Sequence, residues 1–163
     1  MFVVISAIFV WVKSPYINIP FSGPFHAAKY AAYVEPAKRM QEHGPFWYQK
    51  NYLRTTAGNP FKYDGTYKTF SSYPILEWIL AGTQELFPLE SYEHNARVVM
   101  TIIGIILLLT CYVFLQRFFT RKQILFLITL LALNSVFQFF THLTVLDPIN
   151  LIFFFIALHI LLN

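Results

Sequence analysis

The chain has 163 residues, of which 56% are hydrophobic, 19% are aromatic and only 12% are charged. A soluble domain carries about a quarter charged residues, so this composition argues against a soluble enzyme core, a disordered chain and a collagen-like chain. The net charge is +4, but the Lys and Arg residues form no basic stripe, which argues against a nucleic-acid partner. Cys111 is the single cysteine, so it excludes an internal disulfide and a cysteine-based zinc site. The composition predicts an integral membrane protein.

The first predicted element is a short apolar helix over residues 1–13. A membrane-spanning helix needs about 20 apolar residues, so this stretch is short for a span. A signal peptide would require a positive charge before this stretch and a small-residue cleavage site after it, and the sequence has neither. We therefore expect a short or truncated first transmembrane helix.

Residues 14–95 are predicted to form a long external loop, which holds most of the Pro, Gly, Tyr, Trp and charged residues. The pattern over residues 26–43 predicts an amphipathic helix that ends at Gly44 as its cap. Pro36 within it predicts a kink or two short pieces.

A second amphipathic helix is expected where the sequence reads YPILEWILAGTQELF, opened by Pro74 and ended by Pro88. Both amphipathic helices are expected to lie flat on the bilayer. On the first of them, Glu35 and Glu42 share a face with Lys38 or Arg39 as expected salt-bridge partners.

Three further spans are predicted near residues 96–117, 123–142 and 147–163. Residues 98–116 carry no charge, and Asp147 is the only charged residue from position 123 to the end of the sequence. The second apolar stretch is long enough for two spans, and Asp147-Pro148 is the natural break because proline at a helix start has no backbone donor to lose. The expected fold is an all-α membrane protein with about four transmembrane helices.

The orientation follows from Arg117, Arg121 and Lys122, which lie in one short turn. Short loops rich in Lys and Arg stay in the cytoplasm, so the long loop and Asp147 are expected on the opposite, non-cytoplasmic face. We expect a multi-pass protein of a bacterial or archaeal plasma membrane rather than of the endoplasmic reticulum.

Two places carry candidate chemistry. A carboxylate at a membrane helix end, such as Asp147, is costly unless it faces water, a cation or a partner, although it would also suit the helix dipole. His142 lies close enough in sequence to approach it at the same turn. In the long loop, Lys62 and Lys68 flank Asp64, where they could bind a lipid-linked phosphate or be solvated loop charges.

Taken in order, these pieces resemble the N-terminal part of the GT-C membrane glycosyltransferases, above all the dolichyl-phosphate-mannose protein mannosyltransferases and the aminoarabinose transferases. The likeness rests on four segments that follow one another with the family's spacing between apolar spans. They are YVEPAKRMQEHG, YPILEWILAGTQELF, ESYEHNARVVMTIIG and NSVFQFFTHLTVLDPINLIFFFIALHIL.

The resemblance implies an enzyme that moves a mannose-like sugar from a polyprenyl-phosphate donor to a protein or lipid acceptor. It implies a carboxylate base, Asp64 or Glu35, that deprotonates the acceptor. It also implies that Lys62, Lys68 and Asp147 bind the donor phosphate, with Asp147 as a ligand of a divalent metal ion. Members of the family are several times longer, so we expect this chain to be the N-terminal part of a longer protein.

The sequence departs from the family at the residues before Tyr33, where Ala28, Lys29 and Tyr30 replace the usual acid. This departure leaves two other functions open. One is a non-catalytic membrane subunit or relic that keeps the fold and binds lipid or a partner. The other is a transporter fragment, for which the few polar residues within the spans, Asn134 and Gln138, give little support.

Overall fold

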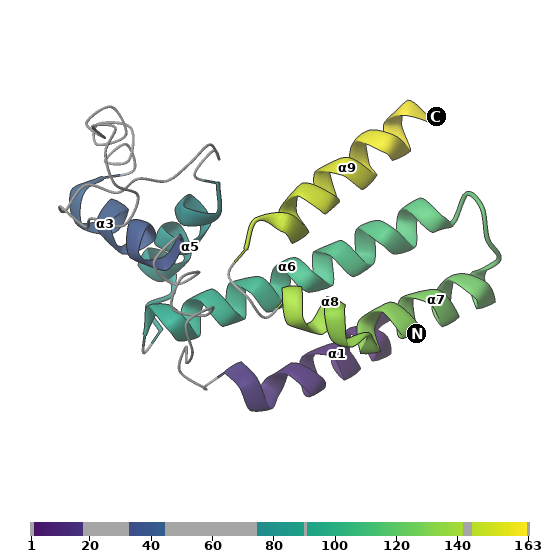
Figure 1. Cartoon of the computed structure of the whole chain (residues 1–163), viewed down its shortest axis with the longest axis horizontal. Helices are drawn as coiled ribbons and strands as arrows, with labels where there is room; N and C mark the ends of the chain where they lie inside the picture. The colour runs from purple at the N-terminus through teal and green to yellow at the C-terminus, as the bar shows by residue number, and fades with distance from the viewer. Residues whose placement is uncertain (1, 18–32, 45–74, 90, 142–144, 163) are drawn as a thin grey trace, which may run out of the picture. The chain divides into compact units, whose positions relative to one another are not determined.

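The computed structural model describes residues 2–17, 33–44, 75–89, 91–141 and 145–162, and these ranges contain helices and no strand. The chain divides into two compact units: unit 1 is Met1–Pro20 with Arg97–Asn163, and unit 2 is Phe21–Ala96. The predicted all-α fold is confirmed over the described ranges. The helices, labelled in Figure 1, are α1 (Phe2–Ile17), α3 (Glu35–His43), α5 (Ile75–Leu86), α6 (Tyr92–Leu115), α7 (Arg121–Leu133), α8 (Ser135–Phe140) and α9 (Asp147–Leu161).

The core of unit 1 forms where α1, α6 and α7 pack together. Phe9 of α1 is fully buried, and its ring lies against Gly104 of α6, where glycine leaves room for the ring. Cys111 belongs to the same apolar cluster and is buried. The buried members of the cluster are Ile5, Phe9, Leu107, Leu108, Cys111, Ile124, Leu125, Ile128 and Ala132.

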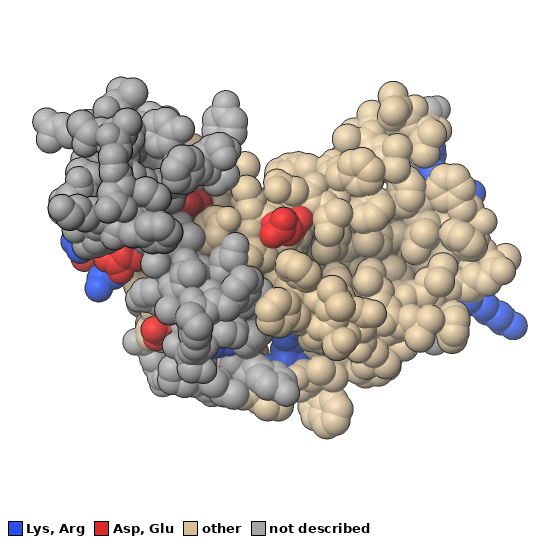
Figure 2. Space-filling model, viewed as in Figure 1, with Lys and Arg blue, Asp and Glu red and all other residues tan. Residues whose placement is uncertain are grey.

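One helix of the described residues, α6, is long and apolar enough to cross a membrane. Its 24 residues rise about 36 Å, against a hydrocarbon core of roughly 30 Å. The helices α1 and α9 are apolar but shorter, so four spans stays a prediction. The visible surface of unit 1 is mostly uncharged, with Lys and Arg side chains at the end where α6 leads into α7 (Figure 2).

The helix predicted over residues 123–142 is interrupted, so its continuity was predicted wrongly. It forms two pieces, α7 and α8, and Asn134 between them has an extended backbone with φ −66° and ψ 127°. The Asn134 side-chain oxygen accepts hydrogen bonds from the backbone N–H groups of Val136 at 2.9 Å and Phe137 at 3.1 Å. These bonds satisfy donors that the start of α8 would otherwise leave unpaired, which is why the break falls at an asparagine.

We expect Asn134→Ala to lower the free energy of unfolding by about 1 kcal/mol, because alanine cannot accept these two bonds. Asn134→Ser is the control, since serine keeps an oxygen that can cap the helix. Thermal unfolding in detergent, followed by circular dichroism, measures both variants. An alanine variant as stable as the wild type would show that the cap does not hold the break.

In unit 2, α3 packs against α5. Pro36 lies in the first turn of α3, where its missing N–H costs nothing. The kink predicted at Pro36 stays a prediction. The helix ends as predicted at Gly44, whose φ of 93° suits glycine and whose N–H donates to the Met40 carbonyl at 2.8 Å. The predicted part of the helix at residues 26–32 lies outside the described residues.

Asn95, at the start of α6, connects that helix to α5 within unit 2. Its amide nitrogen donates to the Leu80 carbonyl at 2.9 Å, and its oxygen accepts from the Thr83 hydroxyl at 3.1 Å. Because Asn95 is 2% exposed, both of its polar atoms need such partners. The amphipathic helix predicted after Pro74 is confirmed as α5. The two bonds attach α5 to Asn95.

Candidate functional site

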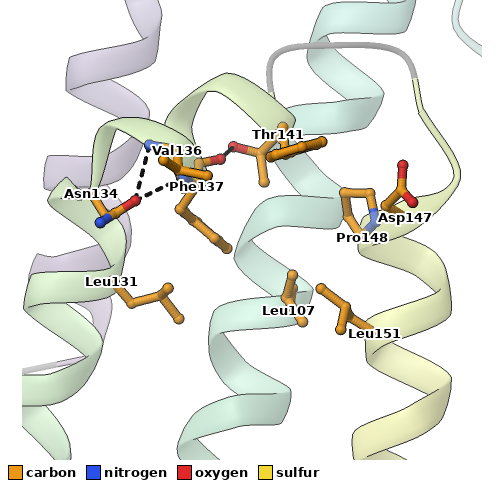
Figure 3. Close-up of a pocket in the computed structure, with 10 residues that line it drawn as sticks. Leu107, Leu131, Asn134, Val136, Phe137, Thr141, Asp147, Pro148 and Leu151 are labelled. Atoms are coloured by element: carbon orange, nitrogen blue, oxygen red, sulfur yellow. Dashed lines mark hydrogen bonds between the residues drawn. The ribbon is translucent and has the colours of Figure 1, made fainter.

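The start of α9 lies beside a cavity of about 350 Å³ in unit 1. Figure 3 shows Asn134, Thr141 and Asp147 toward one end of this cavity and Leu107 and Leu131 toward the other. Most of the lining is therefore apolar, and its few polar side chains lie toward one end. Its lining residues are Leu107, Leu131, Asn134, Val136, Phe137, Phe140, Thr141, Asp147, Pro148 and Leu151.

Asp147 is a charged group that lines this cavity. The Asn134 oxygen caps α8, and the Thr141 hydroxyl donates to the Phe137 carbonyl at 2.7 Å. Asp147 is exposed in the first turn of α9, where the helix dipole favours a carboxylate, and it makes no hydrogen bond or ion pair with another described residue. A cationic or hydrogen-bond-donating ligand at the polar end of the cavity would meet this carboxylate.

The predicted metal ion at Asp147 stays a prediction. No group of three or more His, Cys, Asp or Glu side chains within the described ranges could hold a metal ion. A lone carboxylate binds a divalent cation weakly, because such ions take several oxygen ligands. His142, which we expected near Asp147, lies outside the described residues.

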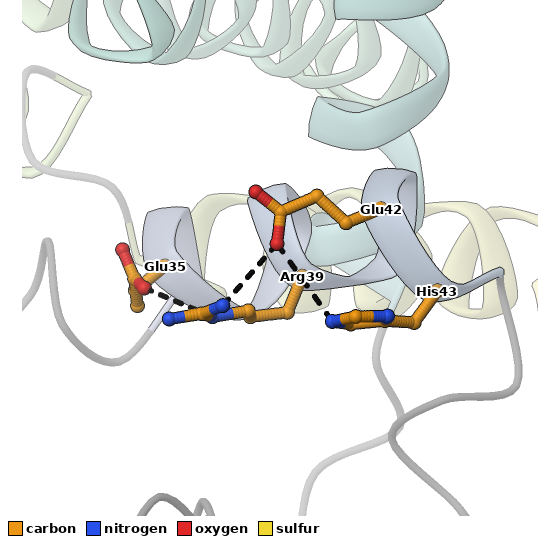
Figure 4. A network of polar contacts seen from close by, with 4 residues as sticks. All are labelled: Glu35, Arg39, Glu42 and His43. Carbon is orange, nitrogen blue, oxygen red and sulfur yellow. Dashed lines mark hydrogen bonds and ion pairs between the residues drawn. The ribbon is translucent and has the colours of Figure 1, made fainter.

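Glu35, one of the two candidate bases, belongs to a network of charges on α3 (Figure 4). Its carboxylate lies 3.3 Å from Nε of Arg39, and the same guanidinium lies 3.2 Å from the carboxylate of Glu42. His43 lies 3.8 Å from Glu42 at the end of the network. The predicted partnership of Glu35 and Glu42 with Arg39 is confirmed. It gives Glu35 a structural partner of its own.

The other predicted site residues lie outside the described residues. These are Asp64, the alternative base, and the phosphate-binding candidates Lys62 and Lys68. Glu35 belongs to unit 2 and Asp147 to unit 1. Their assignment to one site stays a prediction.

Glu77 of α5 is a candidate that the sequence did not single out. The residue is 1% exposed, and its Oε2 atom is buried without a hydrogen-bond partner among the described residues. Burial raises the pKa of this carboxyl from 4.5 to about 7. The signal in the sequence is its position next to Leu76 and three residues before Leu80, on the apolar face of an amphipathic helix.

Unit 1 also contains two buried cations, Lys13 and Arg97, which are 2% and 3% exposed. They lie near the ends of apolar helices, where charged side chains would be expected to reach the surface.

No protein-family model, curated protein or solved structure matches this chain. The functional inference therefore rests on the chemistry of the candidate residues.

Proposed function

We propose that this chain is a membrane glycosyltransferase, or the N-terminal part of one, that uses a polyprenyl-phosphate sugar as donor. The observation that carries the proposal is the cavity beside Asp147, which is mostly apolar and has its polar side chains toward one end. A polyprenyl phosphate has the same division into a polar head and a hydrocarbon chain. The ordered resemblance of four segments to the GT-C family supports the same conclusion.

The proposed location is a membrane crossed several times. Besides α6, the apolar helices α1 and α9 support this, because their large side chains stay exposed in unit 1, as lipid-facing residues would. Examples are Trp11 at 74% exposed and Leu161 at 80% exposed. We place the turn between α6 and α7 in the cytoplasm and the start of α9 on the opposite face, following the positive charges of that turn.

In the proposed reaction, a carboxylate removes the proton of an acceptor hydroxyl, which attacks the anomeric carbon of the donor. The bond from that carbon to the phosphate oxygen breaks, and the polyprenyl phosphate leaves with the bonding electrons. The sugar, mannose-like, thereby passes to a protein or lipid acceptor with inversion. We assign the base to Asp64 or Glu35, and the neutralisation of the phosphate to Lys62 and Lys68.

Asp147 cannot contact a phosphate directly without repulsion, because both are anions. We assign it to orienting the donor through a cation that lies between the carboxylate and the phosphate. A divalent metal ion would supply such a charge. Asp147 would then be one of its ligands.

We expect Asp147→Asn to reduce sugar transfer on the order of 100-fold, because the amide keeps the shape of the carboxylate but loses its charge. The measurement is transfer of radiolabelled mannose from a polyprenyl-phosphate donor by the reconstituted protein in its native full length. Asn150→Ala is the matched control, since Asn150 is exposed on the same helix, three residues along. Wild-type transfer by the Asp147 variant would show that the site is assigned wrongly.

The second candidate function is a non-catalytic membrane subunit that binds lipid or a partner. Two observations favour it: the ion pair that engages Glu35, and the absence of an acid at residues 28–30. Measuring both binding and transfer with the same reconstituted protein distinguishes the two functions. A binding subunit would bind polyprenyl phosphate but would transfer sugar from no donor.

A further inference from the structure

A buried carboxyl group lies on the packed face of α5 in unit 2. Glu77 is 1% exposed, and the residues that α5 buries beside it are Leu76 and Leu80, both fully buried. Its Oε2 atom has no hydrogen-bond partner among the described residues. A carboxyl group that leaves water without a full set of partners loses free energy even when it is neutral, and it loses far more when it is charged. The free energy of closing this face of α5 therefore depends on the proton of Glu77.

Helix α3 packs against α5 and contributes an apolar surface. Its buried residues are Pro36, Ala37 and Met40, and the last two are at most 3% exposed. These side chains offer a carboxylate neither a positive charge nor a hydrogen-bond donor. A helix of nine residues is marginal in water on its own, so α3 depends on its packing to stay helical.

The titratable side chains on α3, on the rest of α5 and on the part of α6 within unit 2 are at least partly exposed, unlike Glu77. Besides the charge network of α3, they are Lys38, Glu85, Tyr92, Glu93 and His94. Burial raises the pKa of Glu77 from 4.5 to about 7, and a hydrogen bond from its own backbone N–H opposes this rise in part. Removal of the burial would therefore return the pKa toward its ordinary value.

The two helices are attached to the start of α6 by different kinds of bond. The buried Asn95 holds α5 through its hydrogen bonds with the Leu80 carbonyl and the Thr83 hydroxyl. The bond to α3 runs from the Tyr92 hydroxyl to the side-chain oxygen of Gln41, and it is exposed. Water competes with an exposed hydrogen bond, so this bond holds less firmly than the buried ones. Of the two helices, α3 is thus the one that is released more easily.

We propose that α3 is a pH-dependent cover over Glu77, which closes on α5 while the carboxyl is protonated and opens when the carboxyl ionises. In the closed state α3 keeps the neutral group away from water, and in the open state water hydrates the carboxylate. Because the closed state holds the proton more tightly, the ratio of open to closed molecules rises by up to about tenfold per pH unit between pH 4.5 and about 7. Above that range both states are ionised and the ratio is constant. The cover depends on α3 and Glu77, so it stands or fails independently of sugar transfer.

Hydrogen exchange of the backbone amides, measured by mass spectrometry on the full chain in detergent, tests the cover. The protection of the α3 amides, corrected for the intrinsic effect of pH on exchange, should fall at least about tenfold between about pH 5 and about pH 7. The α5 amides should keep their protection, because Asn95 holds that helix. Glu77→Gln should abolish the fall, since the amide stays uncharged. Glu85→Gln, at an exposed residue of the same helix, is the matched control and should retain it.

Three results would overturn the cover. The first is level protection of α3 across this pH range in the natural chain, and this measurement needs no variant. The second is an equal loss of protection from α3, α5 and α6, which would show that unit 2 unfolds as a whole. The third is a fall that persists in Glu77→Gln, which would assign the titration to another group. Should Glu77→Gln fail to fold, Glu77→Met replaces it, because methionine fills a similar volume without a charge.

Discussion

Gly104→Leu is expected to destabilise unit 1 by about 3 kcal/mol, because the Phe9 ring occupies the space that a side chain at this residue would need. A Cβ atom on residue 104 would lie 2.7 Å from Cζ of Phe9 and 3.2 Å from Cγ2 of Thr141. The ring of Phe9 is fully buried in the cluster around Leu108, so it cannot move aside without displacing its neighbours. Unfolding in detergent, followed by circular dichroism, measures the loss.

Two alanine variants separate this clash from the conformational preference of glycine. Gly82 lies in α5, and a Cβ atom there would meet nothing within 4 Å. We expect Gly82→Ala to stabilise its helix by about 1 kcal/mol, the ordinary advantage of alanine over glycine. Gly104→Ala would gain the same amount and lose more from the contact with Phe9. Equal stabilisation by both would contradict the close contact between the Phe9 ring and Gly104.

The second large effect is expected at Glu77, whose buried carboxyl has its pKa raised from 4.5 to about 7. Below pH 4.5 the group is protonated in both the folded and the unfolded chain, so it imposes no penalty. Above that pH the unfolded chain loses the proton first, and stability falls by about 1.4 kcal/mol per pH unit. The fall ends near pH 7, where the folded carboxyl also ionises, at a total of about 3 kcal/mol.

Glu77→Gln should remove this pH dependence and stabilise the protein by about 3 kcal/mol above neutral pH, because the amide stays uncharged. Denaturant unfolding from about pH 5 to about pH 8 measures the difference. Glu85→Gln, at an exposed residue of the same helix, is the matched control and should leave the slope unchanged. An unchanged slope in Glu77→Gln would show that another group titrates.

The features that were predicted correctly depend on neighbours in the chain. Helix α3 ends at Gly44, whose backbone has a φ of 93°. Glycine adopts such a φ readily, so this helix end can be predicted from the residue itself. The pairing of Glu35 with Arg39 follows from a spacing of four on one helix. The apolar stretch of α6 likewise predicts a long helix without reference to the rest of the fold.

The features that were missed depend on contacts between distant parts of the chain. Asn134 can lie inside an apolar helix or cap a new one, and only the folded chain shows that it caps α8. Lys13 is buried because Gln138, which is 125 residues away in sequence, provides its acceptor. The burial of Glu77 depends in the same way on tertiary packing, which a pattern along one helix does not determine. Of the candidate site, only Glu35 and Asp147 are described, so the remaining assignments stay predictions.

Because Cys111 is buried, the membrane topology can be mapped with introduced cysteines without first removing the natural one. It is the single cysteine, and it lies inside the apolar cluster of unit 1. Reagents that modify thiols react with accessible thiolates, so the natural protein stays unlabelled by impermeant maleimides. Single cysteines introduced at exposed positions, such as Lys122 in α7 or His43 in α3, would then report which side of the bilayer each position faces. Labelling of intact and of opened cells thereby reads the orientation of the chain directly.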